Sequence, residues 1–164
     1  AVHDPFRQET FWAERDQGCW LGAQKLQVNS LTTLDQALLC TGFAPHPPEQ
    51  WEVCRQLQQQ SRGIRVTGCA SLDLAYVACG RSDAFWEVDL KAWDVAAGIL
   101  LVQEAGGQVT DLHGNPATLL SENYLACSST LAPAMLKVMF PAFGNDSPIQ
   151  ASKSSGQMSS SYDP

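Results

Sequence analysis

The chain has 164 residues, of which 45% are hydrophobic, and a formal net charge of −7. This length corresponds to one domain or half of a larger one, with enough apolar residues to bury a core. The acidic balance argues against nucleic acid or an anionic membrane as the main partner, and no apolar run reaches the length of a membrane span. An anionic substrate would therefore need a local positive element, for which a metal ion is the natural candidate.

The N-terminal part of the sequence predicts a series of antiparallel hairpins. Residues 2–5 are typical of a strand end and a turn, and residues 9–15 alternate polar and apolar side chains as a half-buried strand does. Residues 16–18 form a hairpin turn from which residues 19–21 return. Residues 26–28 are predicted to add another short strand.

The rest of the chain alternates predicted strands and helices. The predicted elements are a buried strand over residues 37–41, a loop over 45–48, a helix over 49–60, a strand over 64–67, a helix ended by Gly80, a strand over 83–87, a helix over 95–104, a strand over 108–111, a strand over 123–127 and a helix over 131–139 capped by Ser129 and Thr130. This alternation favours an α/β layered sheet, to which the opening hairpins add antiparallel strands.

The predicted helix over residues 95–104 is apolar nearly all round, which indicates that it is buried. Asp94 stands in its first turn, where backbone N–H groups lack partners and the helix dipole favours negative charge. Asp94 can therefore be a helix cap, or a ligand of a hard cation such as Mg²⁺. From spacing alone, the cap is the favoured interpretation.

None of the six cysteines belongs to a Cys-x-x-Cys pair, and no histidines stand at the spacing of zinc ligands. In a chain with this much core, the cysteines are expected to be free thiols of a reducing compartment. This expectation favours the cytoplasm or the stroma of an organelle.

Four segments carry a resemblance to a known family: Gly68-Cys69-Ala70-Ser71-Leu72-Asp73, Asp83-Ala84-Phe85-Trp86-Glu87, Trp93-Asp94-Val95-Ala96-Ala97-Gly98 and Glu104-Ala105-Gly106-Gly107. In this order they closely resemble the C-terminal half of the inositol monophosphatase family of Mg²⁺-dependent, lithium-sensitive phosphatases. The resemblance implies an αβαβα layered fold with a mixed sheet and flanking helices. Residues 1–144 would form a domain that lacks the N-terminal part with the first metal motif, and residues 145–164 a disordered polar tail.

The resemblance also implies roles for particular residues. Asp94 would be catalytic and a Mg²⁺ ligand close to the attacking water, and Glu87 would accept hydrogen bonds from substrate hydroxyls. Gly68, Cys69 and Ala70 would contact the substrate from a tight turn into a helix. The family usually has Ser or Thr at the position of Cys69, and a thiol is a weaker hydrogen bonder.

From the residues alone, other interpretations stay open for three charged side chains. Glu87 is equally well explained as a solvated acid at a strand end. Lys91 is better explained as an exposed lysine before a helix than as a phosphate ligand. Asp73 is better explained by the N-terminus of its own helix than by catalysis.

The family's other metal ligands, a Glu-Glu pair and an Asp-Pro-x-Asp-Gly-Thr loop, do not occur in this sequence. One aspartate cannot hold the two metal ions that phosphate-ester hydrolysis of this kind uses. The chain also begins at Ala1, on strand-like sequence, so we expect it to be cut from something longer. A fragment, a truncated product and a non-catalytic remnant all remain open.

We therefore expect a Mg²⁺-dependent phosphomonoesterase that hydrolyses inositol monophosphate or a related small sugar phosphate and is inactive as this chain alone. Its partner would be the small phosphorylated polyol or sugar, with no nucleic acid and no membrane. A homodimer is a further expectation, because family enzymes are commonly dimers. The alternative is a binding or dimerisation module that keeps the fold without the chemistry.

Overall fold

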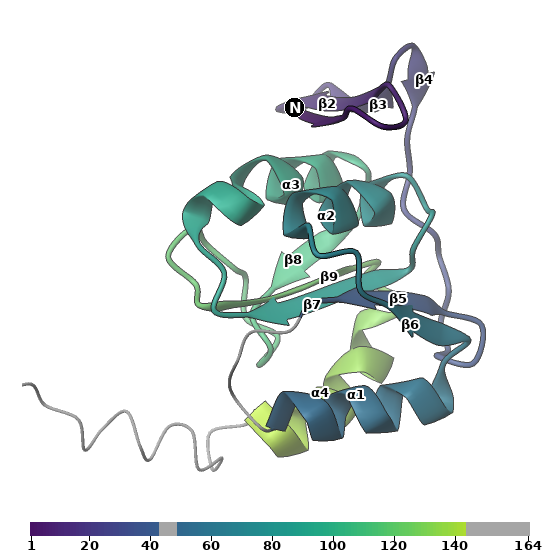
Figure 1. The fold of residues 1–164 in the computed structure, drawn as a ribbon, viewed down its shortest axis with the longest axis vertical. Coiled ribbons are helices and arrows are strands. Elements are labelled where there is room, and N and C mark those ends of the chain that lie inside the picture. Colours follow the sequence, from purple (N-terminus) through teal and green to yellow (C-terminus); the bar gives the residue numbers. More distant parts are fainter. Residues whose placement is uncertain (43–48, 144–164) are drawn as a thin grey trace, which may run out of the picture.

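The computed structural model describes residues 1–42 and 49–143, which form alternating layers of strands and helices (Figure 1). In chain order the elements are β1 (Val2–Asp4), β2 (Glu9–Glu14), β3 (Gly18–Leu21), β4 (Gln24–Lys25), β5 (Leu38–Thr41), α1 (Glu49–Gln60), β6 (Gly63–Arg65), α2 (Ala70–Ala78), β7 (Ala84–Val88), α3 (Ala92–Glu104), β8 (Gln108–Thr110), β9 (Asn123–Cys127) and α4 (Ala132–Phe143). The predicted α/β layered fold is confirmed. The predicted loop over 45–48 and the tail over 145–164 lie outside the described residues.

The first layer is an antiparallel meander of β1, β2, β3 and β4 in sequence order. Its registers pair Val2 with Phe11 and Phe11 with Leu21. Because side chains alternate between the two faces of a strand, Phe11 is fully buried toward α2 and α3 while Trp12 faces outward. The indole of Trp12 stacks on that of Trp20 with ring centroids 5.8 Å apart.

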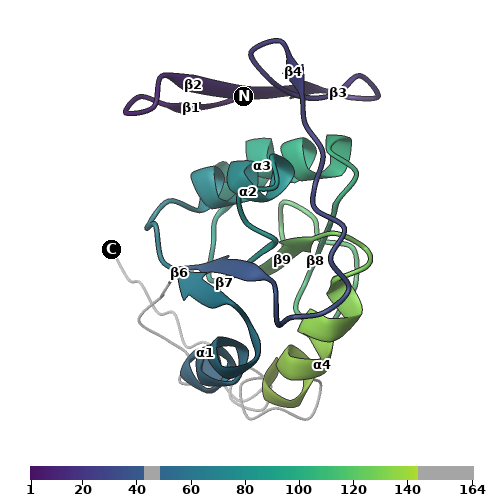
Figure 2. The ribbon, with the colours of Figure 1, turned by 90° about the vertical axis from the view of Figure 1, so that its right-hand side faces the viewer.

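The second sheet has five strands in the order β6-β5-β7-β9-β8. Strands β6, β5 and β7 run parallel, whereas β9 is antiparallel to both β7 and β8. Helices α2 and α3 cover one face of this sheet and separate it from the meander, while α1 and α4 cover the other face (Figures 1 and 2). The carboxyl ends of the three parallel strands therefore share one edge of the sheet.

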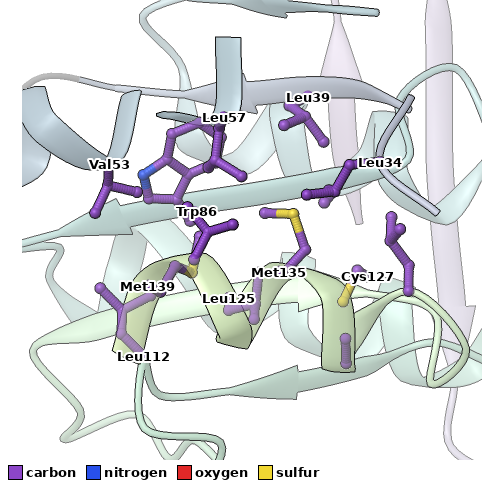
Figure 3. Packing of buried hydrophobic residues seen from close by; sticks show 14 of the residues in the cluster. Leu34, Leu39, Val53, Leu57, Trp86, Leu112, Leu125, Cys127, Met135 and Met139 are labelled. Atoms are coloured by element: carbon purple, nitrogen blue, oxygen red, sulfur yellow. The ribbon is translucent and has the colours of Figure 1, made fainter. Parts of the chain in front are cut away.

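The core beneath the second sheet is built around Trp86 of β7, which is fully buried. Figure 3 shows its indole among side chains of α1 and α4, including Leu57, Met135 and Met139. Burial of a large apolar side chain of this kind contributes about 1.5–3 kcal/mol. This core fixes α1 and α4 against the sheet and leaves the opposite face for α2 and α3.

Helices α2 and α3 approach each other closely at Gly98. A Cβ atom at this position would overlap with the side chain of Leu74 in α2. The absence of a side chain at Gly98 therefore allows the two helices to pack side by side between the sheets.

Most of the predicted elements are confirmed, with ends that differ by a few residues. Gly80 follows α2 with a φ of 72°, as the predicted helix end requires. The predicted strand over residues 26–28 is wrong, because β4 is Gln24–Lys25 and the chain then leaves the meander. The backbone N–H of Leu26 still donates to the Cys19 carbonyl of β3, but that of Val28 donates to the carbonyl of Ala105 after α3.

The predicted cap of the last helix is also wrong. The hydroxyl of Ser128 accepts a hydrogen bond from the Leu131 backbone N–H at 3.2 Å, whereas Thr130 donates its hydroxyl to the Leu31 carbonyl. The helix that follows runs past the predicted end at residue 139 to Phe143.

The expectation that the helix over residues 95–104 is buried all round is only partly correct. Val95, Leu101 and Val102 of α3 are buried, but Trp93 is 81% exposed and Ala96 is also exposed. Small and apolar residues on this outer stripe mask the amphipathic pattern, because alanine is compatible with either environment. No helix among residues 1–42 and 49–143 has the length and apolar character to cross a membrane.

We predict that Gly98→Ala destabilises the fold by roughly 1–3 kcal/mol, because the added methyl group overpacks the contact with Leu74. Ala96→Gly, at an exposed position of the same helix, should cost only about 1 kcal/mol through helix propensity. Urea unfolding of both variants measures these changes. A Gly98→Ala variant more stable than the wild type would contradict the close packing, since helix propensity alone favours alanine.

Candidate functional site

A pocket of about 500 Å³ opens at the carboxyl ends of the parallel strands β6, β5 and β7. It is lined by residues that end or follow these strands or lie at the start of α2 and α3: Gly42, Val66, Gly68, Cys69, Ala70, Ser71, Glu87, Leu90 and Asp94. Ligands of open α/β sheets bind in crevices at this edge of the parallel strands. The topology therefore places the pocket where a ligand site is expected.

Glu87 supplies a carboxylate from β7, near the end of this central strand. Its neighbours Trp86 and Val88 point to the α1 and α4 side, so Glu87 points to the side of α2 and α3. Burial raises the pKa of Glu87 to about 7, and the negative charges of Asp73 and Asp94 add to this effect. Glu87 can therefore accept hydrogen bonds as a carboxylate or donate one when protonated near neutral pH.

Gly68, Cys69 and Ala70 form the turn that leads into α2. Cys69 is the N-cap residue, with extended φ and ψ of −144° and 94°, but its side chain forms no capping hydrogen bond. The backbone N–H of Cys69 donates to the Thr67 hydroxyl at 3.3 Å. The N-terminal turn of α2 thus borders the pocket with backbone N–H groups and the positive end of the helix dipole, both of which favour an anion.

Asp94 lies in the first turn of α3 and lines the same pocket. Its Oδ2 accepts a hydrogen bond from the Lys91 backbone N–H at 3.0 Å, which fixes the carboxylate at the helix N-terminus. The capping interpretation is confirmed by this bond. A cap and a ligand are compatible, because a carboxylate has two oxygens and about four acceptor positions.

Asp73 lies behind the pocket in the first turn of α2 and is almost completely buried. Its Oδ2 accepts a hydrogen bond from the Thr67 hydroxyl at 2.9 Å, and burial raises its pKa to about 6. Asp73 thus ties the turn before α2 to the helix, as the sequence indicates, and adds negative charge beneath Glu87.

All five residues that the sequence analysis assigns to the site line this one pocket: Gly68, Cys69, Ala70, Glu87 and Asp94. Their roles stay predictions. Lys91 is exposed and its ammonium group pairs with the Asp89 carboxylate at 2.8 Å, as expected for a lysine before a helix. Four further lining residues are not predicted from the sequence: Gly42, Val66, Ser71 and Leu90.

The described residues do not by themselves fit a magnesium centre. Asp94 offers the hard oxygen donor that Mg²⁺ prefers. Within residues 1–42 and 49–143, however, no three His, Cys, Asp or Glu side chains are grouped so that they could hold a metal ion. Among these residues, Asp94 is therefore the one pocket carboxylate that we regard as a candidate metal ligand.

The sequence model described as "Inositol monophosphatase family" matches residues 1–140. Among curated relatives, "Nus factor SuhB" from Pseudomonas aeruginosa is 46% identical over 147 residues, covering 85% of this chain and 54% of the relative. "Inositol-1-monophosphatase" from Caulobacter vibrioides is 41% identical over 142 residues, covering 83% of this chain and 56% of the relative. The chain thus spans about half the length of the curated relatives it matches.

Solved structures show the same similarity in three dimensions. The inositol monophosphatase from Anabaena (Nostoc) has a TM-score of 0.81 and 33% sequence identity, with 85% of this chain and 58% of that chain covered. The fold described above is therefore that of about half of this structure.

We predict that Cys69→Ser stabilises the fold by about 1 kcal/mol, because a serine hydroxyl at the N-cap accepts a hydrogen bond that the thiol does not form. Cys69→Ala is the matched control, and it should leave the free energy of unfolding nearly unchanged. Urea unfolding measures both. Equal stabilities of the serine and alanine variants would contradict the assignment of Cys69 as an uncompensated N-cap.

We also predict that the free energy of unfolding falls as the pH rises from 4.5 to 7. Burial raises the pKa of Glu87 from 4.5 to about 7, so the folded state binds this proton more tightly than the unfolded chain does. The contribution of Glu87 to stability is complete below the unfolded pKa and is lost as the pH rises through the folded pKa. Because Glu87 is only half-buried and solvent screens its charge, we expect a loss of about 1–2 kcal/mol.

Glu87→Gln isolates this contribution, because the amide does not titrate. Its unfolding free energy should decline less with pH than that of the wild type, with a residual slope from Asp73, whose pKa burial also raises. Parallel profiles of unfolding free energy against pH for the two proteins would show that the pKa of Glu87 is not raised in the folded state.

Proposed function

This chain belongs to the inositol monophosphatase family, and from that premise we propose that it forms the substrate-binding side of a Mg²⁺-dependent phosphomonoesterase site. The substrate would be inositol monophosphate or a related small sugar phosphate. The family is a phosphatase family whose members act on small phosphorylated compounds.

The observation that carries the proposal is the convergence of two helix N-termini and the half-buried Glu87 carboxylate on one pocket. The N-termini of α2 and α3 favour a negative group, such as a phosphate, through their backbone N–H groups and dipoles. Glu87 offers a carboxylate that can accept hydrogen bonds from hydroxyl groups. A compound that carries both a phosphate and several hydroxyl groups uses both features.

Hydrolysis needs more metal ligands than the described residues supply. Activating a water and stabilising the leaving oxygen of a phosphate ester are tasks for bound metal ions, and the described residues offer Asp94 as one candidate ligand. The matches cover only about half of each relative. We infer that the remaining carboxylates are supplied by a segment that corresponds to the other half of the relatives. The chain alone would then bind substrate without turning it over.

A second candidate function is a binding role without catalysis, and the names of the relatives favour it. The relative with 46% identity is named "Nus factor SuhB", and this name refers to a role as a factor and not to a hydrolytic activity. Because of this name, the expectation from net charge that the protein has no nucleic-acid partner has no support. In this alternative, the partner is another macromolecule or a second copy of the chain.

Location in a reducing compartment is part of the same proposal. All six cysteines are free thiols, and four of them are buried in the described core. Burial raises the pKa of the Cys127 thiol to about 12, which keeps it protonated and unreactive. A cytoplasmic or stromal protein would keep its cysteines in this state.

The test is Asp94→Asn in a full-length protein that carries this chain. Asparagine caps a helix nearly as well as aspartate, so stability should change by less than about 0.5 kcal/mol. If Asp94 is a metal ligand, Mg²⁺-dependent phosphate release from inositol 1-phosphate should fall at least about 100-fold.

The control is Asp89→Asn, an exposed aspartate outside the pocket whose partner is Lys91. This variant should keep its activity. Full activity of Asp94→Asn would reduce Asp94 to a cap and favour the binding role over the phosphatase.

A further inference from the structure

Gly42 stands beside Glu87 at the carboxyl ends of two parallel strands. The register pairs Cys40 of β5 with Phe85 of β7 and Thr41 with Trp86, so the next residue along each strand is Gly42 and Glu87. Cys40 and Phe85 both point into the core on the side of α2 and α3. Since side chains alternate along a strand, a side chain at position 42 would point to the same side as Glu87, toward the pocket.

The Glu87 carboxylate occupies the space that this side chain would take. A Cβ atom at Gly42 would overlap with both carboxylate oxygens of Glu87 and with its Cδ. Gly42 itself is buried and lines the pocket. Gly68, the other glycine of the pocket, differs, because a Cβ there would meet no atom within 4 Å.

The end of β5 is also held in place. The side-chain amide of Gln50, which is almost completely buried in α1, donates a hydrogen bond to the Gly42 carbonyl. The hydroxyl of Thr41 donates to the Trp86 carbonyl of β7 at 2.7 Å. Because these two hydrogen bonds hold the backbone at the end of β5, a side chain at position 42 would displace the flexible Glu87 carboxylate and not the strand.

We propose that Gly42 is a positioning residue, whose missing side chain lets the Glu87 carboxylate lie over the end of β5 and so fixes the acceptor for substrate hydroxyls. The placement of the carboxylate follows from the two strands alone. Its consequence for a polyol phosphate rests on the proposed function. A larger residue at position 42 would push the acceptor into the pocket and change which hydroxyl-bearing ligands fit.

The test combines Gly42→Ala with two substitutions of Glu87 that differ in size. Glu87→Ala removes the carboxylate and opens the space above Gly42, whereas Glu87→Gln keeps a group of the same shape. Gly42→Ala should lower the midpoint of thermal unfolding in the wild-type and Glu87→Gln backgrounds, and have almost no effect in the Glu87→Ala background. Such non-additivity is the sign of a direct contact.

Ligand binding is measured on the same variants by calorimetry with inositol 1-phosphate as the probe. Gly42→Ala should weaken binding about tenfold, the cost of one displaced hydrogen bond to a charged group. In the Glu87→Ala background it should change affinity by less than about twofold. Normal affinity of Gly42→Ala beside a large loss in Glu87→Ala would overturn the positioning role.

The unfolding measurements separate this proposal from the proposed function. If the wild type does not bind inositol 1-phosphate but Gly42→Ala is tolerated only without the Glu87 carboxylate, the placement stands and the substrate is wrong. If Gly42→Ala lowers the unfolding midpoint equally in all three backgrounds, or fails to fold even with Glu87→Ala, the clash is not with Glu87 and the proposal is wrong.

Discussion

The close packing of α2 on α3 joins the two sheets of the molecule and positions the pocket. These helices form the layer between the meander and the five-stranded sheet, and Gly98 lets them lie side by side against Leu74. Phe11 of the meander packs on one side of this layer and Phe85 of β7 on the other. Because α2 and α3 each follow a parallel strand, β6 and β7 respectively, this packing also brings their N-termini to the same edge of the sheet. The pocket is a consequence of how the core is filled.

Electrostatics explains how so acidic a chain can present a site for an anion. The positive ends of two helix dipoles border the pocket, while three carboxylates lie on or beneath it. Burial raises the pKa values of Glu87 and Asp73, and repulsion from Asp73 and Asp94 adds to the effect at Glu87, so part of this negative charge is absent near neutral pH. The carboxylate of Asp94, in the first turn of α3, is oriented by the hydrogen bond that it accepts from the Lys91 backbone N–H. A ligand with a phosphate at the helix N-termini and hydroxyl groups near Glu87 satisfies both kinds of group, and a cation beside Asp94 would complement them.

The sequence predicts those features of the site that are set by residues next to one another in the chain. Asp94 and the turn at Gly68 stand directly before predicted helices, and Glu87 ends a predicted strand, so their positions follow once the elements are recognised. Gly42 could not be found in this way, because its importance arises from the pairing of β5 with β7, which is distant in sequence. The outer stripe of α3 was mispredicted since alanine carries no clear signal of burial. The position of the short strand β4 is mispredicted because Leu26 is buried and Val28 partly buried without either residue belonging to a strand.

We propose that this chain contributes the substrate side of a phosphatase site, and that its described residues hold too few metal ligands for hydrolysis. The most direct test is phosphate release from inositol 1-phosphate by the 164-residue chain with Mg²⁺, in the presence and absence of lithium. We predict that the chain binds the substrate but releases no phosphate under either condition. Lithium-sensitive release would contradict this proposal, and would show that further acidic residues of this chain, such as Asp73, complete a metal centre together with Asp94.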